Sequence, residues 1–317
     1  LIFKINERNT VIVTITGGMG YLGGELVKLL LMDSSINKIN IIDKGVYGIS
    51  HLSSLFNSKI NVLIKDIRDK PAIASVIAES DVIVHLASLV GAPLVDRKPI
   101  EAYETNIDGT KCITDLVSRS QRFIFASTGS SYGKVNGICT EKNTKISPLS
   151  SYGRHKAEGE AIVSDKNAIS LRFATVYGLS YRTRDDLYIH SMIQKALIDR
   201  SVVLYEGHAS RTFMHVNDAA RAVKHFIDIA DLPYDIFNVG DPTLSFTKLE
   251  ICNLISKYTP FTISENSYAV DIDQRDYIVS YDRIIGTGFK CEKVLTSEIE
   301  VIMAYYSARF NCGYLNG

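Results

Sequence analysis

Residues 11–24 read VIVTITGGMGYLGG, and this stretch decides the fold. Residues 11–15 are apolar or β-branched, a composition typical of a buried parallel strand. Gly17, Gly20 and Gly23 follow at three-residue spacing, and residues 25–32 have apolar side chains at helical spacing. The stretch therefore predicts a strand, a glycine-rich turn and a helix, in that order.

The three glycines have distinct expected roles in binding a dinucleotide. Gly17 allows a tight turn, Gly20 lets the backbone approach a pyrophosphate, and Gly23 lets helix and strand pack closely. The helix N-terminus then offers unpaired N–H groups and a positive dipole end to an anion. A second strand over residues 38–42 ends at Asp43, where an acidic side chain is expected to bond the adenosine ribose. Three glycines alone would also suit an ordinary turn, but the ordered combination predicts dinucleotide binding.

The bulk composition narrows the class of protein. The 317 residues can bury a sizeable core, and the net charge of zero gives no attraction to nucleic acid or an anionic membrane. The five cysteines are scattered without a Cys-x-x-Cys pair, which argues against zinc and against a disulfide framework. No apolar run is long enough to cross a bilayer, and the opening ten residues have too short an apolar core for a signal peptide. We expect a cytoplasmic protein without a metal or a membrane partner.

Strands and helices alternate through the first half of the chain. We predict further strands at 60–64, 81–86, 122–126 and 169–174, helices at 70–80, 99–118 and 151–164, and loops at 89–98 and 135–148. This alternation predicts an α/β fold with a doubly wound, Rossmann-type parallel sheet. Residues 1–178 form the expected NAD-binding domain.

The pattern of the sequence changes after residue 178. We expect helices at 187–200, 217–231, 246–258 and 294–310, short strands at 202–205, 211–216 and 236–239, and an extended segment at 271–279. Residues 179–317 should mainly form a smaller α/β substrate-binding lobe over the strand ends, with 213–240 returning to the first domain.

Polar residues near strand ends leave alternatives open. Asp66, just after the strand at 60–64, either meets the adenine amino group or caps the following helix. Asn106 lies within a predicted helix, where an Asn usually faces solvent or bonds backbone. Residues 127–133 read STGSSYG, an unusual density of hydroxyls that could also be a plain loop.

Tyr152 and Lys156 are four residues apart, so they share one face of the predicted helix. A phenol ionises near pH ~10, and an ammonium one turn away favours the phenolate. Such a tyrosine can take the proton of an alcohol while a hydride leaves the carbon for nicotinamide. Thr128, at a strand end, can bond the same hydroxyl. Tyr-x-x-x-Lys pairs occur on many helices, but here the pair follows a dinucleotide loop, which favours catalysis.

At this point the sequence resembles the extended short-chain dehydrogenase/reductases, in the NAD-dependent sugar-nucleotide epimerase/dehydratase branch. The resemblance covers nearly the whole chain. Its motifs are TGGMGYLGG (16–24), HLAS (85–88), STGSSYG (127–133), YGRHK (152–156), LRFATVYG (171–178), RTFMHVND (211–218), FNVG (237–240) and QRDYIVSYDRI (274–284).

The resemblance implies oxidation at C4 of a nucleoside-diphosphate hexose with NAD as cofactor. It implies that Thr128, Tyr152 and Lys156 are catalytic. The residues expected to bind NAD are Gly17, Gly20, Tyr21, Leu22, Gly23, Asp43, Asp66, Ile67, Ala87, Tyr152 and Lys156. Those expected to bind substrate are Thr128, Thr175, Arg211 and Arg275, the arginines gripping the diphosphate, with Arg182 and Arg184 as alternatives. A homodimer through the helices at 99–118 and 152–164 is also implied.

The chain departs from the family at three places. Dehydratases have an Asp-Glu pair where this sequence has Gly129 and Ser130, which weakens the expectation of a 4,6-dehydratase. UDP-galactose 4-epimerases have a Lys at Val90 and an Asn at Thr175. We expect a sugar-nucleotide 4-epimerase. The alternatives are a 4-dehydrogenase or ketoreductase and, in another class, a non-catalytic NAD-binding regulatory protein.

Overall fold

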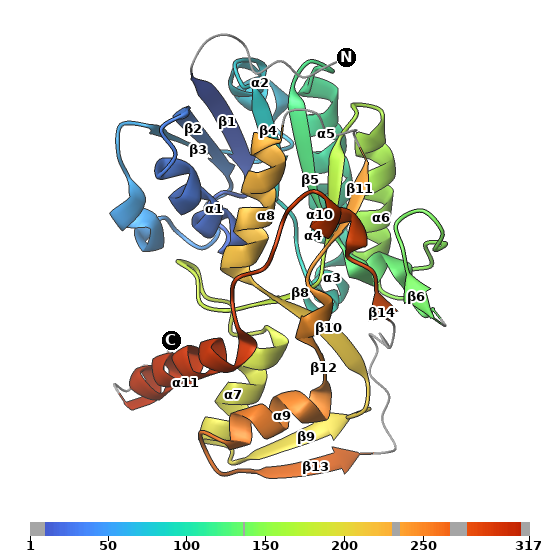
Figure 1. Ribbon diagram of the computed structural model, residues 1–317. Helices are drawn as coiled ribbons and strands as arrows, with labels where there is room; N and C mark the ends of the chain where they lie inside the picture. Colours follow the sequence, from blue (N-terminus) through green and yellow to red (C-terminus); the bar gives the residue numbers. More distant parts are fainter. Residues whose placement is uncertain (1–9, 136, 230–234, 267–277, 312–317) are drawn as a thin grey trace.

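A seven-stranded parallel sheet forms the centre of the larger lobe (Figure 1). The computed structural model describes residues 10–135, 137–229, 235–266 and 278–311. The strand order is β11-β7-β5-β4-β1-β2-β3. The strands are β1 (Val11–Thr16), β2 (Ile36–Asp43), β3 (Ile60–Ile64), β4 (Val82–His85), β5 (Arg122–Thr128), β7 (Ile169–Phe173) and β11 (Ile236–Val239). The order confirms the predicted doubly wound sheet, and β11 adds a strand from late in the chain.

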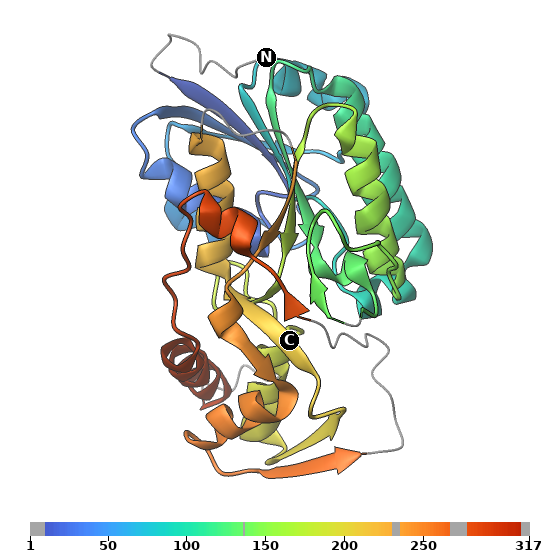
Figure 2. The same ribbon diagram turned by 45° about the vertical axis from the view of Figure 1, so that its right-hand side comes forward.

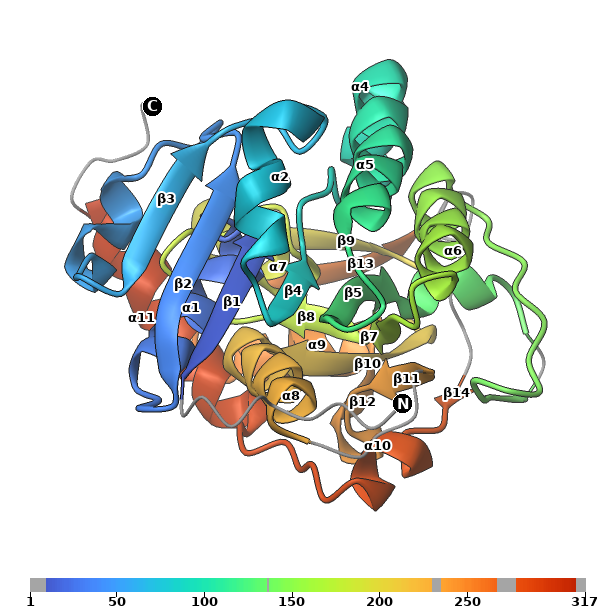
Figure 3. The ribbon, with the colours of Figure 1, turned by 90° about the horizontal axis from the view of Figure 1, so that it is seen from above.

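Helices cover both faces of this sheet, as Figure 3 shows from above. One face packs against α1 (Tyr21–Leu31) and α8 (Val216–Asp228). The other packs against α2 (Lys70–Ala78), α5 (Gly109–Leu116) and α6 (Ser151–Ser164). Neighbouring strand residues alternate between the two cores: Ile41 joins the first and Ile42 the second. Both sides of the sheet are therefore buried, which explains its continuous apolar strands.

The remaining elements on the sheet side are short. They are η1 (Ser50–Leu55), α3 (Ala92–Arg97), α4 (Pro99–Tyr103), the π-helical turn η2 (Glu104–Asp108), η3 (Gly129–Tyr132) and α10 (Asp282–Gly286). A two-stranded parallel ladder pairs β6 (Ile138–Cys139) with β14 (Ile278–Val279).

A smaller lobe lies below the carboxyl ends of the strands (Figures 1 and 2). Its core is formed by α7 (Tyr188–Ile198), α9 (Lys248–Ser256) and α11 (Leu295–Asn311) together with β9 (Ser201–Tyr205). β9 pairs in parallel with β13 (Thr262–Asn266). A three-stranded sheet of β8 (Thr175–Tyr177), β10 (Ser210–His215) and β12 (Ser245–Thr247) joins the lobes, and η4 (Pro242–Leu244) precedes β12.

The structure differs from the predicted elements at several points. α1 begins at Tyr21 rather than residue 25, because Gly20 is its N-cap and the glycine turn leads directly into the helix. The predicted loop 89–98 contains α3, and 135–148 contains β6. The helix expected from residue 246 starts at Lys248, where Thr247 and Glu250 form a capping box. β13 and α10 were not predicted, and most of the extended segment 271–279 lies outside the described residues.

Candidate active site

A cavity of about 590 Å³ opens at the carboxyl ends of the parallel strands. It lies where β1 and β4 are neighbours, because the chain leaves β1 toward β2 and β3 and then crosses back to β4. Such a switch point is where open α/β sheets bind ligands. The predicted residues that line this cavity are Gly17, Gly20, Tyr21, Leu22, Gly23, Asp43, Asp66, Ile67, Ala87, Thr128, Tyr152, Lys156 and Thr175.

The predicted substrate residue Arg211 lies outside the large cavity. It lines a neighbouring cavity of about 30 Å³, which shares Phe173, Ala174 and Thr175 with the large one. Arg275 lies outside the described residues. Conversely, Arg182 and Arg184, the alternatives from the sequence, both line the large cavity.

The glycine turn has the close approaches that its spacing predicts. Gly17 has a φ of +72°, and a Cβ there would lie 2.7 Å from the backbone nitrogen of Ala87. A Cβ on Gly23 would overlap the carbonyl oxygen of Gly17. The N-terminal N–H groups of α1 have no partners within the helix, and Gly20 to Gly23 border the cavity. The turn therefore forms a narrow cradle suited to a pyrophosphate.

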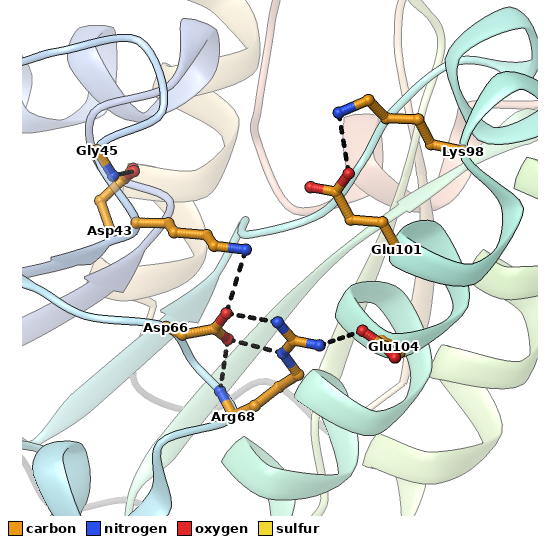
Figure 4. Close-up of polar contacts among 8 residues, drawn as sticks. Asp43, Gly45, Asp66, Arg68, Lys98, Glu101 and Glu104 are labelled. Atoms are coloured by element: carbon orange, nitrogen blue, oxygen red, sulfur yellow. Dashed lines mark hydrogen bonds and ion pairs between the residues drawn. The ribbon is translucent and has the colours of Figure 1, made fainter.

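Two carboxylates, those of Asp43 and Asp66, line the cavity. Figure 4 shows the polar contacts around them. The oxygens of Asp43 accept hydrogen bonds from the backbone N–H groups of Met19 (3.0 Å) and Gly45 (2.9 Å). Asp66 accepts from the Arg68 guanidinium at 2.7 and 3.0 Å, and the Lys44 ammonium lies 3.4 Å away. Arg68 holds the pKa of Asp66 well below its usual range. The backbone bonds fix the direction of Asp43, as a ribose acceptor requires.

The helix-cap interpretation of Asp66 is wrong. The N-cap of α2 is Asp69, whose side chain accepts a hydrogen bond from the backbone N–H of Ala72 at 3.3 Å. Asp66 lies before this cap and bonds Arg68 instead.

The predicted catalytic side chains lie on β5 and on the first two turns of α6. The Thr128 hydroxyl ends β5, donates to Ser130 Oγ at 3.1 Å and accepts from Ser130 N–H at 3.2 Å. Ser150 caps α6 through the backbone N–H of Gly153. This cap fixes the start of the helix, so Tyr152 and Lys156 both face the cavity.

Lys156 is a buried cation with one acidic neighbour on its own helix. It is 4% exposed, and its Nζ lies 5.0 Å from the centroid of the Phe125 ring. Burial lowers its pKa to about 7, and Glu160, one turn further along α6, opposes that shift. Near neutral pH this amine therefore exists in both charge states.

A buried ion pair lies next to the predicted catalytic side chains in the sequence. Glu160 accepts hydrogen bonds from Arg172 of β7 at 2.8 and 2.6 Å, and from the hydroxyl of Ser127 of β5. The pair joins α6, β5 and β7 one helical turn from Lys156 and one residue from Thr128. Removing one partner of such a pair leaves an uncompensated buried charge, so the three elements are held in fixed relative positions.

Asn106 is a site residue whose role sequence reasoning missed. It lies in the π-helical turn η2, where it is buried. Its Oδ1 accepts from the Ser88 hydroxyl and from Leu89 N–H, both at 2.8 Å, and its Nδ2 donates to the Leu89 carbonyl at 2.9 Å. It bonds backbone, as expected, but the backbone belongs to the loop after β4 that lines the cavity. The Asn within a helical run was the only signal in the sequence.

In the described part of the chain, every helix is too short or too polar to span a bilayer. Over the same residues, His, Cys, Asp and Glu side chains form no cluster of three that could hold a metal ion.

A family model described as NAD dependent epimerase/dehydratase family matches residues 13–240. The chain belongs to this family. It is therefore an NAD-dependent enzyme.

Relatives and solved structures agree with this assignment. The Bacillus subtilis protein YtcB, described as an uncharacterized UDP-glucose epimerase, is 30% identical over 72% of this chain and 76% of its own length. The UDP-glucuronic acid 4-epimerase of Bacillus cereus, solved with UDP-glucuronic acid and NAD, has a TM-score of 0.82 and 21% identity, covering 94% of this chain and 99% of that one. The UDP-N-acetylglucosamine 4-epimerase of Methanobrevibacter ruminantium has a TM-score of 0.83 and 20% identity, covering 95% and 99%. These structural likenesses show the fold of this epimerase/dehydratase family member.

Proposed function

We propose that this family member is a nucleoside-diphosphate-sugar 4-epimerase that oxidises C4 transiently. The observation that carries the proposal is that Thr128, Tyr152 and Lys156 line the same cavity as the glycine turn and Asp43. Bound NAD would be held by the glycine turn, Asp43 and Lys156, and it supplies a hydride acceptor and donor. The proton-transfer groups and the dinucleotide cradle then meet at one place.

The chain's own residues account for the proton transfers. The Tyr152 phenolate takes the C4 hydroxyl proton, directly or through the Thr128 hydroxyl, and returns it after the keto sugar has turned. Lys156 in its charged form favours that phenolate and bonds the nicotinamide ribose. Thr175 would contact the sugar, and Arg211 would bind the diphosphate from the adjoining small cavity.

Elimination of water across C5 and C6 is not supported by the residues after Thr128. Gly129 has no side chain, and the Ser130 hydroxyl accepts a hydrogen bond from Thr128. A serine hydroxyl is a poor acid and a poor base at neutral pH unless a partner activates it. This favours an epimer, or a 4-keto sugar that keeps its 6-hydroxyl, over a 6-deoxy product.

The function is tested by incubating the purified protein with a panel of nucleotide sugars in deuterated water and following products by NMR. An epimerase gives the C4 epimer with the original hydrogen at C4 and no deuterium at C5, without added cofactor. Product formation that consumes one added NAD or NADH for each product molecule identifies the 4-dehydrogenase or ketoreductase alternative. A 6-deoxy-4-keto product with deuterium at C5 contradicts the proposal.

The role of Tyr152 is tested by Tyr152→Phe on the substrate found in that panel. General acid–base groups contribute about 10²–10⁴ in rate, so we expect a loss of that size with fold and NAD content kept. Tyr258→Phe is the matched control, because its hydroxyl bonds Thr296 in the smaller lobe. Near wild-type turnover of Tyr152→Phe rules out its role as the base.

We also propose how the chain divides and associates. Residues 1–178, with 213–240, would bind NAD, and 179–317 would mainly bind the sugar nucleotide. The homodimer would form through α4–α5 and α6, which lie side by side on one face (Figure 3). This face exposes Ile100 at 74% and Tyr103 at 44%.

A further inference from the structure

The segment 178–187, here called the arginine loop, connects β8 to α7 and borders the large cavity. Its cavity side presents Arg182, Arg184 and Asp186. Arg182 lies 3.3 Å above the centroid of the Tyr47 ring. Arg184 forms an ion pair with Asp186. The loop therefore places two guanidinium groups on the wall of the cavity that Asp43 and Tyr152 also line.

The beginning of the arginine loop is bonded to the first turn of α1. The carbonyl of Gly178 accepts from the Tyr21 hydroxyl at 2.7 Å, and the Ser180 hydroxyl donates to the Tyr21 carbonyl at 2.6 Å. Gly178 N–H donates to His190 Nε2 at 3.1 Å. Gly178 has a φ of +109°, so the turn that starts the loop depends on a glycine.

The end of the loop is bonded to the C-terminal helix α11. Asp185 accepts from the Tyr306 hydroxyl at 2.7 Å and from Arg309 at 2.8 Å. The Tyr306 oxygen lies 3.0 Å from His190 Nδ1. Burial lowers the pKa of His190 to about 4, so the ring is neutral at pH 7. Because Nε2 accepts from Gly178, Nδ1 carries the proton and donates to Tyr306, which leaves the tyrosine proton for Asp185.

Each group in this series therefore donates a hydrogen bond to the next: Gly178 to His190, His190 to Tyr306, and Tyr306 to Asp185. Asp185 and Asp186 are adjacent but serve opposite sides of the loop: Asp186 pairs with Arg184 at the cavity, whereas Asp185 binds α11. Helix α11 packs on α7 and is remote from the sheet (Figure 1). Its only polar bonds to the arginine loop, among the described residues, are those of Tyr306 and Arg309.

We propose that Tyr306 and Arg309 are positioning residues that hold Arg182 and Arg184 in place to bind the dinucleotide. The ligand class is a phosphate-bearing dinucleotide, which guanidinium groups recognise through paired donors. The proposal deepens the proposed function because it concerns the same site. Its test measures cofactor affinity, so it does not depend on which sugar is the substrate.

The test titrates NADH into the full chain and its variants, each first freed of bound NAD, and follows NADH fluorescence. Tyr306→Phe removes one hydroxyl and should weaken NADH binding at least fivefold. Arg309→Gln should act in the same direction, and Arg309→Lys should restore part of the loss. Tyr305→Phe is the matched control: Tyr305 is the neighbour on α11, and within the described residues its hydroxyl makes no hydrogen bond. The affinity of the Tyr305→Phe variant for NADH should equal that of wild type.

A double-mutant cycle separates positioning from general damage to the fold. Replacing Arg182 and Arg184 together by Gln should weaken NADH binding by about tenfold or more, and adding Tyr306→Phe to that background should cost less than twofold more, since both side chains being positioned are gone. If Tyr306→Phe has its full effect in this background, or none in the wild type, the proposal is overturned. If the protein converts no nucleotide sugar of the panel but gives these NADH results, the proposed epimerase is refuted and this inference still holds.

Discussion

Lys156 would couple stability to catalysis if it has the role we propose. The side chain is buried beside the cavity with Glu160 as a neighbour on the same helix, and its pKa falls from 10.5 to about 7. Between these values the unfolded chain holds a proton that the folded chain does not. Stability contributed by this group therefore increases as pH rises from about 7 to about 10.5, and is lost as pH falls through that range. The charged form that the proposed mechanism uses is the form that burial disfavours.

We expect Lys156→Met to lose turnover by about 10²-fold or more while stabilising the cofactor-free protein. The gain should be about 1–4 kcal/mol at pH 6, because an apolar side chain replaces a buried charge. This gain in stability should shrink as the pH rises through 7, because the wild-type amine then loses its charge. Thermal melts of wild type and variant from pH 6 to 10 measure the difference between their stabilities at each pH. The contributions of other titrating groups cancel in this difference. A variant less stable than wild type at pH 6 contradicts the assignment.

We propose that Asp43 determines which dinucleotide is preferred. Its carboxylate is oriented by two backbone N–H groups and lies at the end of the cavity where the adenosine ribose is expected. A 2′-phosphate there would meet a negative charge, although Lys44 is adjacent in sequence and pairs with Asp66. We expect wild type to prefer NAD over NADP, and Asp43→Asn to shift that ratio at least tenfold toward NADP. Tighter NADP binding by wild type would mean that Lys44 faces the ribose.

At the scale of elements, the glycine turn and α1 work as one unit. The turn is closed by the Gly20 N–H, which donates to the Gly17 carbonyl at 3.0 Å, and α1 starts four residues after Gly17. Gly23 lies within the first turn of α1, against the backbone of Gly17 and Gly18. Close approach of backbone to backbone leaves no side chain that could move aside, so the turn's shape depends directly on the missing Cβ.

We therefore predict that Gly23→Ala destabilises the protein by about 1–3 kcal/mol and weakens NAD binding more than tenfold. The comparison is Gly286→Ala at the end of α10, where an added Cβ meets nothing within 4 Å. That variant should be neutral or slightly stabilising. Denaturant unfolding and NADH titration of both variants check this. Equal effects of the two substitutions would show that neither stability nor NAD binding depends on the close packing at Gly23.

The whole molecule joins two lobes across the cavity. Tyr177 of β8 and Phe213 of β10 belong to the core of the smaller lobe, while β7, directly before β8, belongs to the central sheet. The chain therefore passes between the lobes within a few residues of Thr175, which lines the cavity. A ligand in the cavity would contact the sheet, the arginine loop and the connecting strands together.

For the whole molecule we predict a homodimer that Ile100→Glu disrupts. Ile100 lies on α4 beside α6 and exposes a large apolar side chain. A charge there would be desolvated in the interface, so the dissociation constant of the dimer should rise tenfold or more. Light scattering after size exclusion measures the mass. Val301→Glu, at a half-exposed position on α11, is the control and should leave the assembly unchanged. A monomeric wild type would refute the dimer.

Much of the central sheet was predictable because its signals are local. β3 matches the predicted residues 60–64, α6 begins at the predicted residue 151, and the strand-turn-helix unit at Val11 is where its pattern places it. Tyr152 and Lys156 share a face because a helix repeats every 3.6 residues, whatever surrounds it. Strands such as β13 were missed because an exposed, mostly polar strand has no apolar pattern of its own.

The sequence by itself determined the order of strands and helices, the glycine turn and the spacing of Thr128, Tyr152 and Lys156, because each depends on neighbours a few residues away. Only the tertiary structure decided that Arg182 and Arg184 border the large cavity while Arg211 lines a small one beside it. It alone placed Asn106 against the loop at Leu89 and Tyr306 against Asp185, 121 positions apart in the chain. Such contacts depend on how separate segments pack, and no local pattern encodes the position of a partner so far along the sequence.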